Sequence, residues 1–195
     1  MNTEPVKPAP LISEAIRQSN QKELAALFKN YPEMRIFHFP SFGTWLHFAA
    51  AHSSVQIIDY LVGLGYDVNS RENREEDTPL NNACNEGKAE TVEYFLNHGA
   101  ELDVSTSVRN PLFSAIVGKS PDCARLLIDA GIDTRASYVL EGEVKIRSDA
   151  IAFAMLRGET EIANMIALHN ADGDDAKARE LVAEGDRIAE LRTAA

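Results

Sequence analysis

The side chains of this sequence that could bind a metal or act as nucleophiles are five histidines and two cysteines. They are His38, His47, His52, His98, His169, Cys84 and Cys123. Zinc sites draw on cysteines and histidines close together in the chain, yet no second Cys or His lies within four residues of either cysteine. The sequence also has no glycine-rich phosphate loop and no nucleophile elbow. We therefore expect no catalytic residue, no metal, no cofactor and no small-molecule substrate.

Both cysteines lie in apolar stretches, which is typical of small buried thiols in a reducing compartment. The first residues are not followed by a long apolar run, so the sequence predicts no secretory signal. No segment approaches the roughly 18 apolar residues that a membrane-spanning helix requires. We therefore expect a cytoplasmic protein that makes no membrane contact.

Acidic residues are concentrated in one part of the chain. The formal net charge is -11, and residues 67–103 contribute -7 of it through ten acids and three bases. Such a charge repels nucleic acid and anionic lipid and favours a basic protein partner. Two interpretations stay open, a solvated acidic turn or a docking patch that speeds association with a basic surface. The residues concerned are Glu72, Arg74, Glu75, Glu76, Asp77 and the nearby Glu86.

A second candidate is the aromatic segment at residues 36–45, which contains Phe37, Phe39, Phe42 and Trp45. Connecting segments are usually polar and exposed, so four rings in a predicted connection need a physical reason. Either two or three of the rings close the core beneath the loop, or rings such as Phe42 and Trp45 stay exposed as a binding hot spot.

These candidate residues are positioned by a repeating pattern that becomes visible when the sequence is laid on itself. The copies that contain Leu46, Leu80 and Leu112 each have a capping-type residue two positions earlier, an Ala three positions later and a Gly 19 positions later. Weaker copies contain Ile12 and Ile151. The five apolar anchors are separated by 34, 34, 32 and 39 residues.

Each residue of the pattern has a physical role in a pair of helices. Thr44, Thr78 and Asn110 can accept a hydrogen bond from a free backbone N–H at a helix start. Pro79 and Pro111 suit the first helical position, where no N–H is needed. The glycines at the ends of the second helices, Gly65, Gly99 and Gly131, suit left-handed C-terminal caps. One such pair cannot bury its own apolar face, so neighbouring pairs must stack into one core.

With these residues and this period, the chain resembles the ankyrin-repeat family, whose repeats of about 33 residues carry a Thr-Pro-Leu-His-x-Ala pattern. The resemblance covers roughly residues 10–172 and is most specific at Thr44–Ala50 and Thr78–Gly87. It implies an all-α solenoid of stacked helix pairs joined by finger turns, with His47 bonding the backbone of neighbouring turns. The chain departs from the pattern at Trp45 for Pro, at Asn81, Phe113 and Ala152 for His, and at Ser53 and Lys119 for Gly.

The predicted organisation is a disordered lead at residues 1–10, a repeat array at 11–172 and a capping helix at 173–195. The repeats are expected at about 11–40, 41–73, 74–106, 107–140 and 148–172. Gly185 argues against the last helix, because an interior Gly costs about 1 kcal/mol relative to Ala. Within residues 137–146, two β-rich runs flank Glu141-Gly142 and predict a hairpin. This hairpin is either an extended finger that reaches a partner or an insertion without a binding role.

The resemblance implies a non-enzymatic protein that binds a partner protein through its first helices and fingers. The candidate partner-binding residues are Phe42, Trp45, His52, Glu72, Arg74, Glu75, Glu76, Asp77, Asn85, Glu86, Arg109, Tyr138 and Glu141. Small size, the lack of another domain and concentrated acidity favour a cytoplasmic inhibitor or immunity protein that neutralises a basic partner protein. The alternative is a general regulatory scaffold, or a secreted effector that binds host or client proteins.

Overall fold

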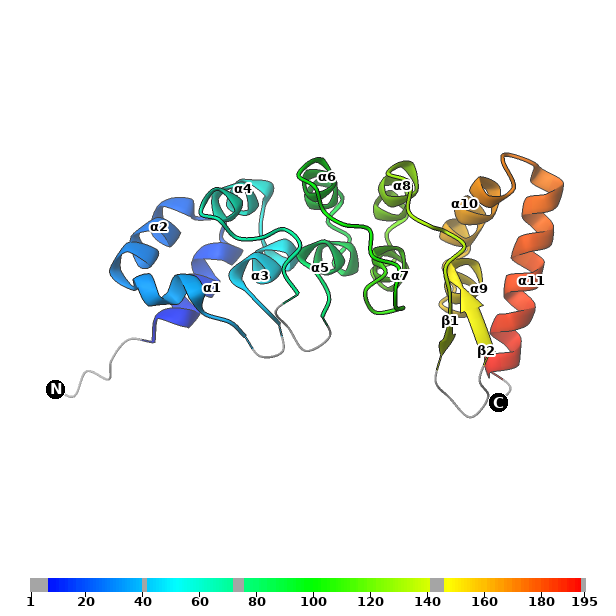
Figure 1. Cartoon of the computed structure of the whole chain (residues 1–195), viewed down its shortest axis with the longest axis horizontal. Coiled ribbons are helices and arrows are strands. Elements are labelled where there is room, and N and C mark those ends of the chain that lie inside the picture. The colour runs from blue at the N-terminus through cyan, green and yellow to red at the C-terminus, as the bar shows by residue number, and fades with distance from the viewer. Residues whose placement is uncertain (1–6, 40–41, 72–75, 141–145, 194–195) are drawn as a thin grey trace.

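The computed structural model describes residues 7–39, 42–71, 76–140 and 146–193. Helices occupy most of these residues and stack side by side into an elongated array, with the two termini at opposite ends (Figure 1). The all-α solenoid of helix pairs inferred from the sequence is therefore confirmed.

Each repeat contributes two helices. The first helices are α1 (Pro8–Arg17), α3 (Trp45–His52), α5 (Pro79–Asn85), α7 (Pro111–Val117) and α9 (Ala150–Leu156). The second helices are α2 (Gln21–Asn30), α4 (Val55–Gly63), α6 (Ala89–Asn97), α8 (Pro121–Asp129) and α10 (Thr160–Asn170). Figure 1 shows the second helices in an upper row and the first helices in a lower row. A short 3-10 helix, η1 (Pro32–Ile36), follows α2.

The predicted caps place the starts of the central first helices. Thr44 accepts a hydrogen bond from the Leu46 N–H, and Thr78 accepts one from the Asn81 N–H. The side chain of Asn110 caps α7 in the same way. Because each cap satisfies an N–H that the helix leaves free, it fixes where the chain turns from finger into helix.

The turn between the two helices of a repeat uses a left-handed residue in four of the five described pairs. Gly87 and Gly158 have φ angles of 65° and 78°, as their glycine identity predicts. Ser19 and Lys119 adopt φ angles of 51° and 53° at the same position. Ser53 is the exception, with an extended φ of -123°. The missing glycine at Lys119 therefore leaves the turn geometry intact, at the modest strain that a left-handed non-glycine residue carries.

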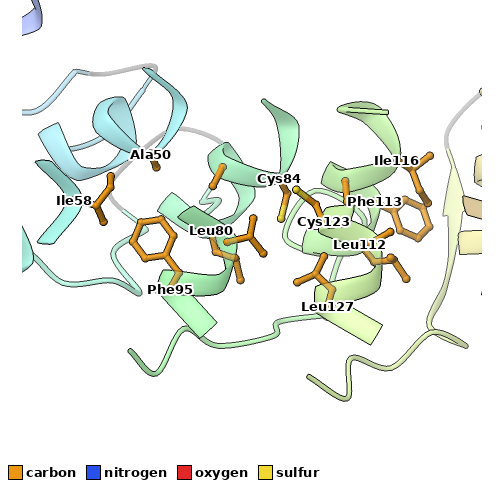
Figure 2. Close-up of a cluster of buried hydrophobic side chains, with 14 of the residues drawn as sticks. Ala50, Ile58, Leu80, Cys84, Phe95, Leu112, Phe113, Ile116, Cys123 and Leu127 are labelled. Carbon is orange, nitrogen blue, oxygen red and sulfur yellow. The ribbon is translucent and has the colours of Figure 1, made fainter. Parts of the chain in front are cut away.

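Apolar side chains from every repeat form one continuous core, which extends from Ile12 to Ala178. Figure 2 shows the ring of Phe95 between Ile58 and Leu80, so that repeats two and three share one packed layer. Neighbouring repeats thus cover the apolar faces that a single helix pair would leave exposed.

Cys84 and Cys123 lie in this core with their sulfur atoms turned toward one another (Figure 2). Burial is the main cause that raises the pKa of both thiols. The prediction of small buried thiols is confirmed, and at neutral pH both sulfurs stay protonated and unreactive.

The N-terminal boundary differs from the prediction. Residues 8–10, expected to belong to a disordered lead, form the first turn of α1 instead. Pro8 and Pro10 are tolerated there because the first N–H groups of a helix have no partner within it. The remainder of the predicted lead, residues 1–6, lies outside the described residues.

A β-hairpin fills the longer spacing before the last repeat. Strand β1 (Ser137–Leu140) pairs antiparallel with β2 (Ile146–Asp149), in a register that places Ser137 opposite Asp149 and Leu140 opposite Ile146. The second strand extends beyond the predicted end at residue 146, and Asp149 then caps α9. The expected turn at Glu141-Gly142 lies outside the described residues.

The C-terminal helix α11 (Asp175–Thr193) stands across the end of the array and packs against α9 and α10 (Figure 1). Gly185 faces α9, where a Cβ atom would lie 2.8 Å from Ile151 Cγ2 and 3.2 Å from the Ala152 nitrogen. The glycine that lowers helix propensity therefore allows a close helix contact, which the sequence alone does not reveal.

Candidate partner-binding surface

A hollow of about 390 Å³ lies on the finger side of α5, α7 and α9, and we call it the central groove. Its apolar lining consists of Val108, Phe113, Val117 and Phe153. Its polar lining consists of Asp77, Asn85, Ser107 and Ser114. The groove therefore joins three consecutive repeats, with apolar side chains at its centre and polar side chains around them.

The central groove has both exposed and buried apolar side chains. Val108 and Val117 are 47% and 42% exposed, whereas Phe113 is 4% exposed. Phe113 and Phe153 stack on each other with ring centroids 4.6 Å apart and an angle of 14°. None of these four residues is among the candidate partner-binding residues chosen from the sequence, because their exposure depends on how the finger and the first helices meet.

Tyr138 of the hairpin supports this groove from one side. Its ring packs edge-on against Phe113, with centroids 5.1 Å apart. Its hydroxyl donates to the Val104 carbonyl at 2.7 Å and accepts from the Asn110 side chain at 3.0 Å. Burial raises the pKa of this hydroxyl. Tyr138 was predicted to contact a partner, but its hydroxyl braces the hairpin against the neighbouring finger.

The acidic finger region is partly neutralised from within. Glu76 forms an ion pair with Arg109 of the next finger, and Arg109 Nη1 lies 3.9 Å from Asp103 Oδ2. Arg71 bonds Asp103 at 2.6 Å and Glu101 at 3.2 Å. These pairs connect successive fingers, so part of the charge counted at residues 67–103 is satisfied inside the protein.

Other predicted residues of the acidic patch are distributed unevenly. Asn85 and Glu86 lie exposed at the end of α5, and Asn85 borders the central groove together with Asp77. Glu72, Arg74, Glu75 and Glu141 fall outside the described residues. The structure thus pairs Glu76 with Arg109 between successive fingers and places Asp77 and Asn85 in the lining of the central groove.

Trp45 does not belong to any exposed surface, which corrects its prediction as a binding residue. Its side chain is 0% exposed, and its indole N–H donates to the Met34 carbonyl at 2.7 Å. Phe39 packs edge-on against it with centroids 4.8 Å apart, and Phe48 at 6.1 Å. For this ring the alternative interpretation holds, in which the aromatic segment closes the core.

Phe42 and His52 lie at the rim of this closed aromatic cluster. Phe42 is half-buried and stacks on His52, with ring centroids 5.9 Å apart. Phe48 contacts His52 edge-on at 4.7 Å. Burial, followed by the positive charge of Arg17, lowers the pKa of His52. These two predicted residues are accessible in part, but they do not line the central groove.

His47 has a structural role in the finger. It is fully buried, and its Nδ1 accepts from the Thr44 N–H at 3.1 Å. Burial is the main cause that lowers its pKa to about 4, so the ring is neutral at pH 7. With Nδ1 as an acceptor, the proton sits on Nε2, which donates to the Asp77 carbonyl at 3.3 Å.

Asn81 performs the same task one repeat later, where the family pattern has His. Its Oδ1 accepts from the Thr78 N–H at 3.2 Å, and its Nδ2 donates to the Arg109 carbonyl at 3.0 Å. An amide reproduces the acceptor and donor of the neutral imidazole. The substitution therefore preserves the link between helix and finger.

The comparison with known families agrees with this geometry. A family model described as ankyrin repeats, in three copies, matches residues 46–138. Residues 46–138 therefore form ankyrin repeats, which indicate a protein-binding module. Within the part of the chain that the structure describes, no helix is long and apolar enough to cross a membrane. The same residues contain no cluster of three His, Cys, Asp or Glu side chains that could hold a metal ion.

Proposed function

We propose that this ankyrin array binds one dedicated partner protein through the central groove, and that binding inhibits the partner. The observation that carries the proposal is the groove itself, where exposed Val108 and Val117 flank the stacked rings of Phe113 and Phe153. Binding hot spots cluster in such apolar pockets, surrounded by polar contacts that exclude water. An apolar side chain of the partner would fill the hollow.

The charge around the groove supports a partner with a basic surface. Asp77 lines the hollow, and Glu86 is exposed at the adjoining end of α5. Charges at an interface rim act mainly on the association rate and on orientation. With a net charge of -11, the chain attracts a basic protein over some distance. An inhibitor or immunity protein acting in the cytoplasm is the form of this proposal that best suits a small acidic binder.

A second candidate function is a general scaffold or a secreted effector without a dedicated basic partner. The ion pairs of Arg71 and Arg109 favour it, because they neutralise part of the finger acidity internally. A scaffold of this kind would bind mainly through the apolar floor of the groove, and its affinity would depend little on salt.

The test compares serine substitutions at two exposed apolar residues on different parts of the array. Partners are captured from the native lysate with the tagged protein, and the affinity of each purified partner is then measured for Val117→Ser and Leu168→Ser. Val117 and Leu168 are 42% and 41% exposed, and both lie in the last turn of a helix. We expect Val117→Ser to weaken binding about tenfold or more, because it removes part of a hot spot. Leu168→Ser should leave the affinity unchanged.

Salt separates the two candidate functions. A dedicated inhibitor of a basic partner should bind more weakly at about 0.5 M than at about 0.1 M salt, because the ions screen the rim charges. Glu86→Lys should likewise weaken the binding of a basic partner. Equal affinity at both salt concentrations would favour the scaffold. An equal loss of affinity in Val117→Ser and Leu168→Ser would show that neither function uses the central groove.

A further inference from the structure

A second hollow, of about 490 Å³, lies at the opposite ends of the helices from the fingers. The inter-helix turns of the first three repeats meet here, and we call this site the turn hollow. Arg17 and His52 are the last residues of α1 and α3, and Ser54 and Lys88 immediately precede α4 and α6. Ser54 and Lys88, one 34-residue repeat apart, thus face the same space.

Two cations of the turn hollow are not paired with carboxylates. The guanidinium of Arg17 lies 4.9 Å from the centre of the Phe48 ring, which holds it at the hollow by a cation–π contact. Among the described residues, neither Arg17 nor Lys88 forms an ion pair, whereas Arg71 and Arg109 each bind acids. These two cations come from different repeats and line one hollow, so both charges act on the same space.

The remaining lining includes serine groups that already bond within the protein, and one acid. Ser53 Oγ donates to the Ile16 carbonyl at 2.6 Å. Ser19 Oγ accepts from the Ser54 N–H at 3.3 Å and lies 3.2 Å from Ser53 Oγ. The nearby starts of α4 and α6 have no side-chain cap, which leaves N–H groups turned toward this edge. Glu90 lies on the same wall and limits the net positive charge.

We propose that the turn hollow binds a phosphate group, carried either by a phosphorylated side chain or by a small phosphorylated molecule. Two full positive charges from different repeats suit a dianion better than a single carboxylate. The uncapped backbone N–H groups at the starts of α4 and α6 can supply further donors to the oxygens of a tetrahedral group. The hollow is also far larger than a carboxylate needs, so the carrier of the phosphate can enter with it.

His52 provides an internal reporter for this site. Its ring lines the hollow, and the charged groups that act on it are Arg17, Glu86 and Lys88. Burial and the two cations lower the pKa of His52, while Glu86 opposes them. A bound dianion would stabilise the imidazolium form, so the pKa of His52 must rise when phosphate binds.

The experiment follows the His52 ring and the backbone amides of residues 52–55 and 88–91 by NMR during titration with inorganic phosphate, with sodium chloride at matched ionic strength as the control. We expect saturable shifts with phosphate, none with chloride, and a higher pKa for His52. Phosphate shifts that follow ionic strength alone, or an unchanged His52 pKa, would overturn the proposal.

Matched variants locate the binding. Arg17→Gln and Lys88→Gln should each weaken phosphate binding about tenfold, because each removes a charge-assisted hydrogen bond. Lys119→Gln, in the fourth turn, is the control, since Lys119 already pairs with Glu159 at 3.6 Å. Equal weakening of phosphate binding in all three variants would show a diffuse charge effect and contradict a localised site in the turn hollow.

A comparison of ligands then identifies the carrier. Inorganic phosphate, phosphoserine and a phosphoserine peptide are titrated in parallel. A peptide that binds at least about tenfold more tightly than free phosphoserine would assign the site to a phosphorylated protein segment, because contacts beyond the phosphate add affinity. Similar affinity for all three would assign it to a small phosphorylated molecule. Binding of none of them would contradict the proposal, and it would leave the central groove untouched.

Discussion

Two aromatic clusters lie along the first helices of this array, one closed and one open. Around Trp45, the rings of Phe39 and Phe48 pack at 4.8 and 6.1 Å and leave the indole without solvent exposure. Around Phe113, the rings of Phe153 and Tyr138 pack at 4.6 and 5.1 Å, and Phe113 and Phe153 line the central groove.

The difference arises from what lies above each cluster. Residues 32–39 fold back over Trp45, and the Met34 carbonyl of η1 accepts its indole N–H. At the second cluster the extra segment forms a hairpin instead, which braces one side through Tyr138 and leaves Val108 and Val117 exposed. Aromatic rings from the first helices and the connecting segments thus close the core in one place and border a surface groove in the other.

The largest effect should come from opening the closed cluster. Trp45→Ala removes a fully buried ring and its hydrogen bond, so we expect a loss of about 3–5 kcal/mol of unfolding free energy. Chemical denaturation followed by far-UV circular dichroism measures it. A loss below about 1 kcal/mol would mean that the ring is not buried as described.

A smaller effect, specific to low pH, should come from His47 beside the closed cluster. Its pKa is lowered from 6.5 to about 4 in the folded state, so the unfolded chain binds the proton first as the pH falls. The stabilising contribution is complete above pH 6.5, and about 3 kcal/mol of it is lost as the pH falls through 4.

His47→Asn isolates this contribution, since Asn81 already makes the equivalent bonds in the next repeat. The difference in unfolding free energy between the two proteins should change with pH between 6.5 and 4. Parallel pH profiles for wild type and His47→Asn would contradict the assigned burial of the ring.

The Tyr138 hydrogen bonds, which brace the open cluster, should contribute less to the unfolding free energy than Trp45 or His47. Tyr138→Phe keeps the ring contact with Phe113 but removes the bonds to Val104 and Asn110, so we expect a loss of about 1–2 kcal/mol. Tyr60→Phe is the control, because the Tyr60 hydroxyl has no hydrogen bond within the described residues. Thermal melts compare Tyr138→Phe with Tyr60→Phe. Equal stabilities would show that the Tyr138 hydroxyl does not stabilise the hairpin.

The sequence predicted the parts of the fold that depend on local chemistry. Thr44, Thr78 and Asn110 were identified as caps because capping needs only a side-chain acceptor beside a helix start. The 32- to 34-residue spacing indicated the stacking, and the family match at residues 46–138 agrees with it.

What the sequence left open or did not show depends on contacts between repeats and with the capping helix. The burial of Trp45 follows from how η1 folds over it, and the close contact at Gly185 follows from how α11 crosses α9. The pairing of Glu76 with Arg109 joins successive fingers, so counting charge along the chain overstated the acidity available to a partner. The sequence placed Val108 in a finger but did not mark it as a candidate binding residue, because nothing in its local sequence distinguishes an exposed Val from a buried one.

The most direct test of the account is hydrogen–deuterium exchange of the protein with and without its captured partner. We predict protection on binding at residues 105–117 and 150–156, around the open cluster, and unchanged exchange at residues 45–52 around the closed one. Protection confined to residues 45–52, with none around the central groove, would contradict the claim that the open aromatic cluster is the partner-binding surface.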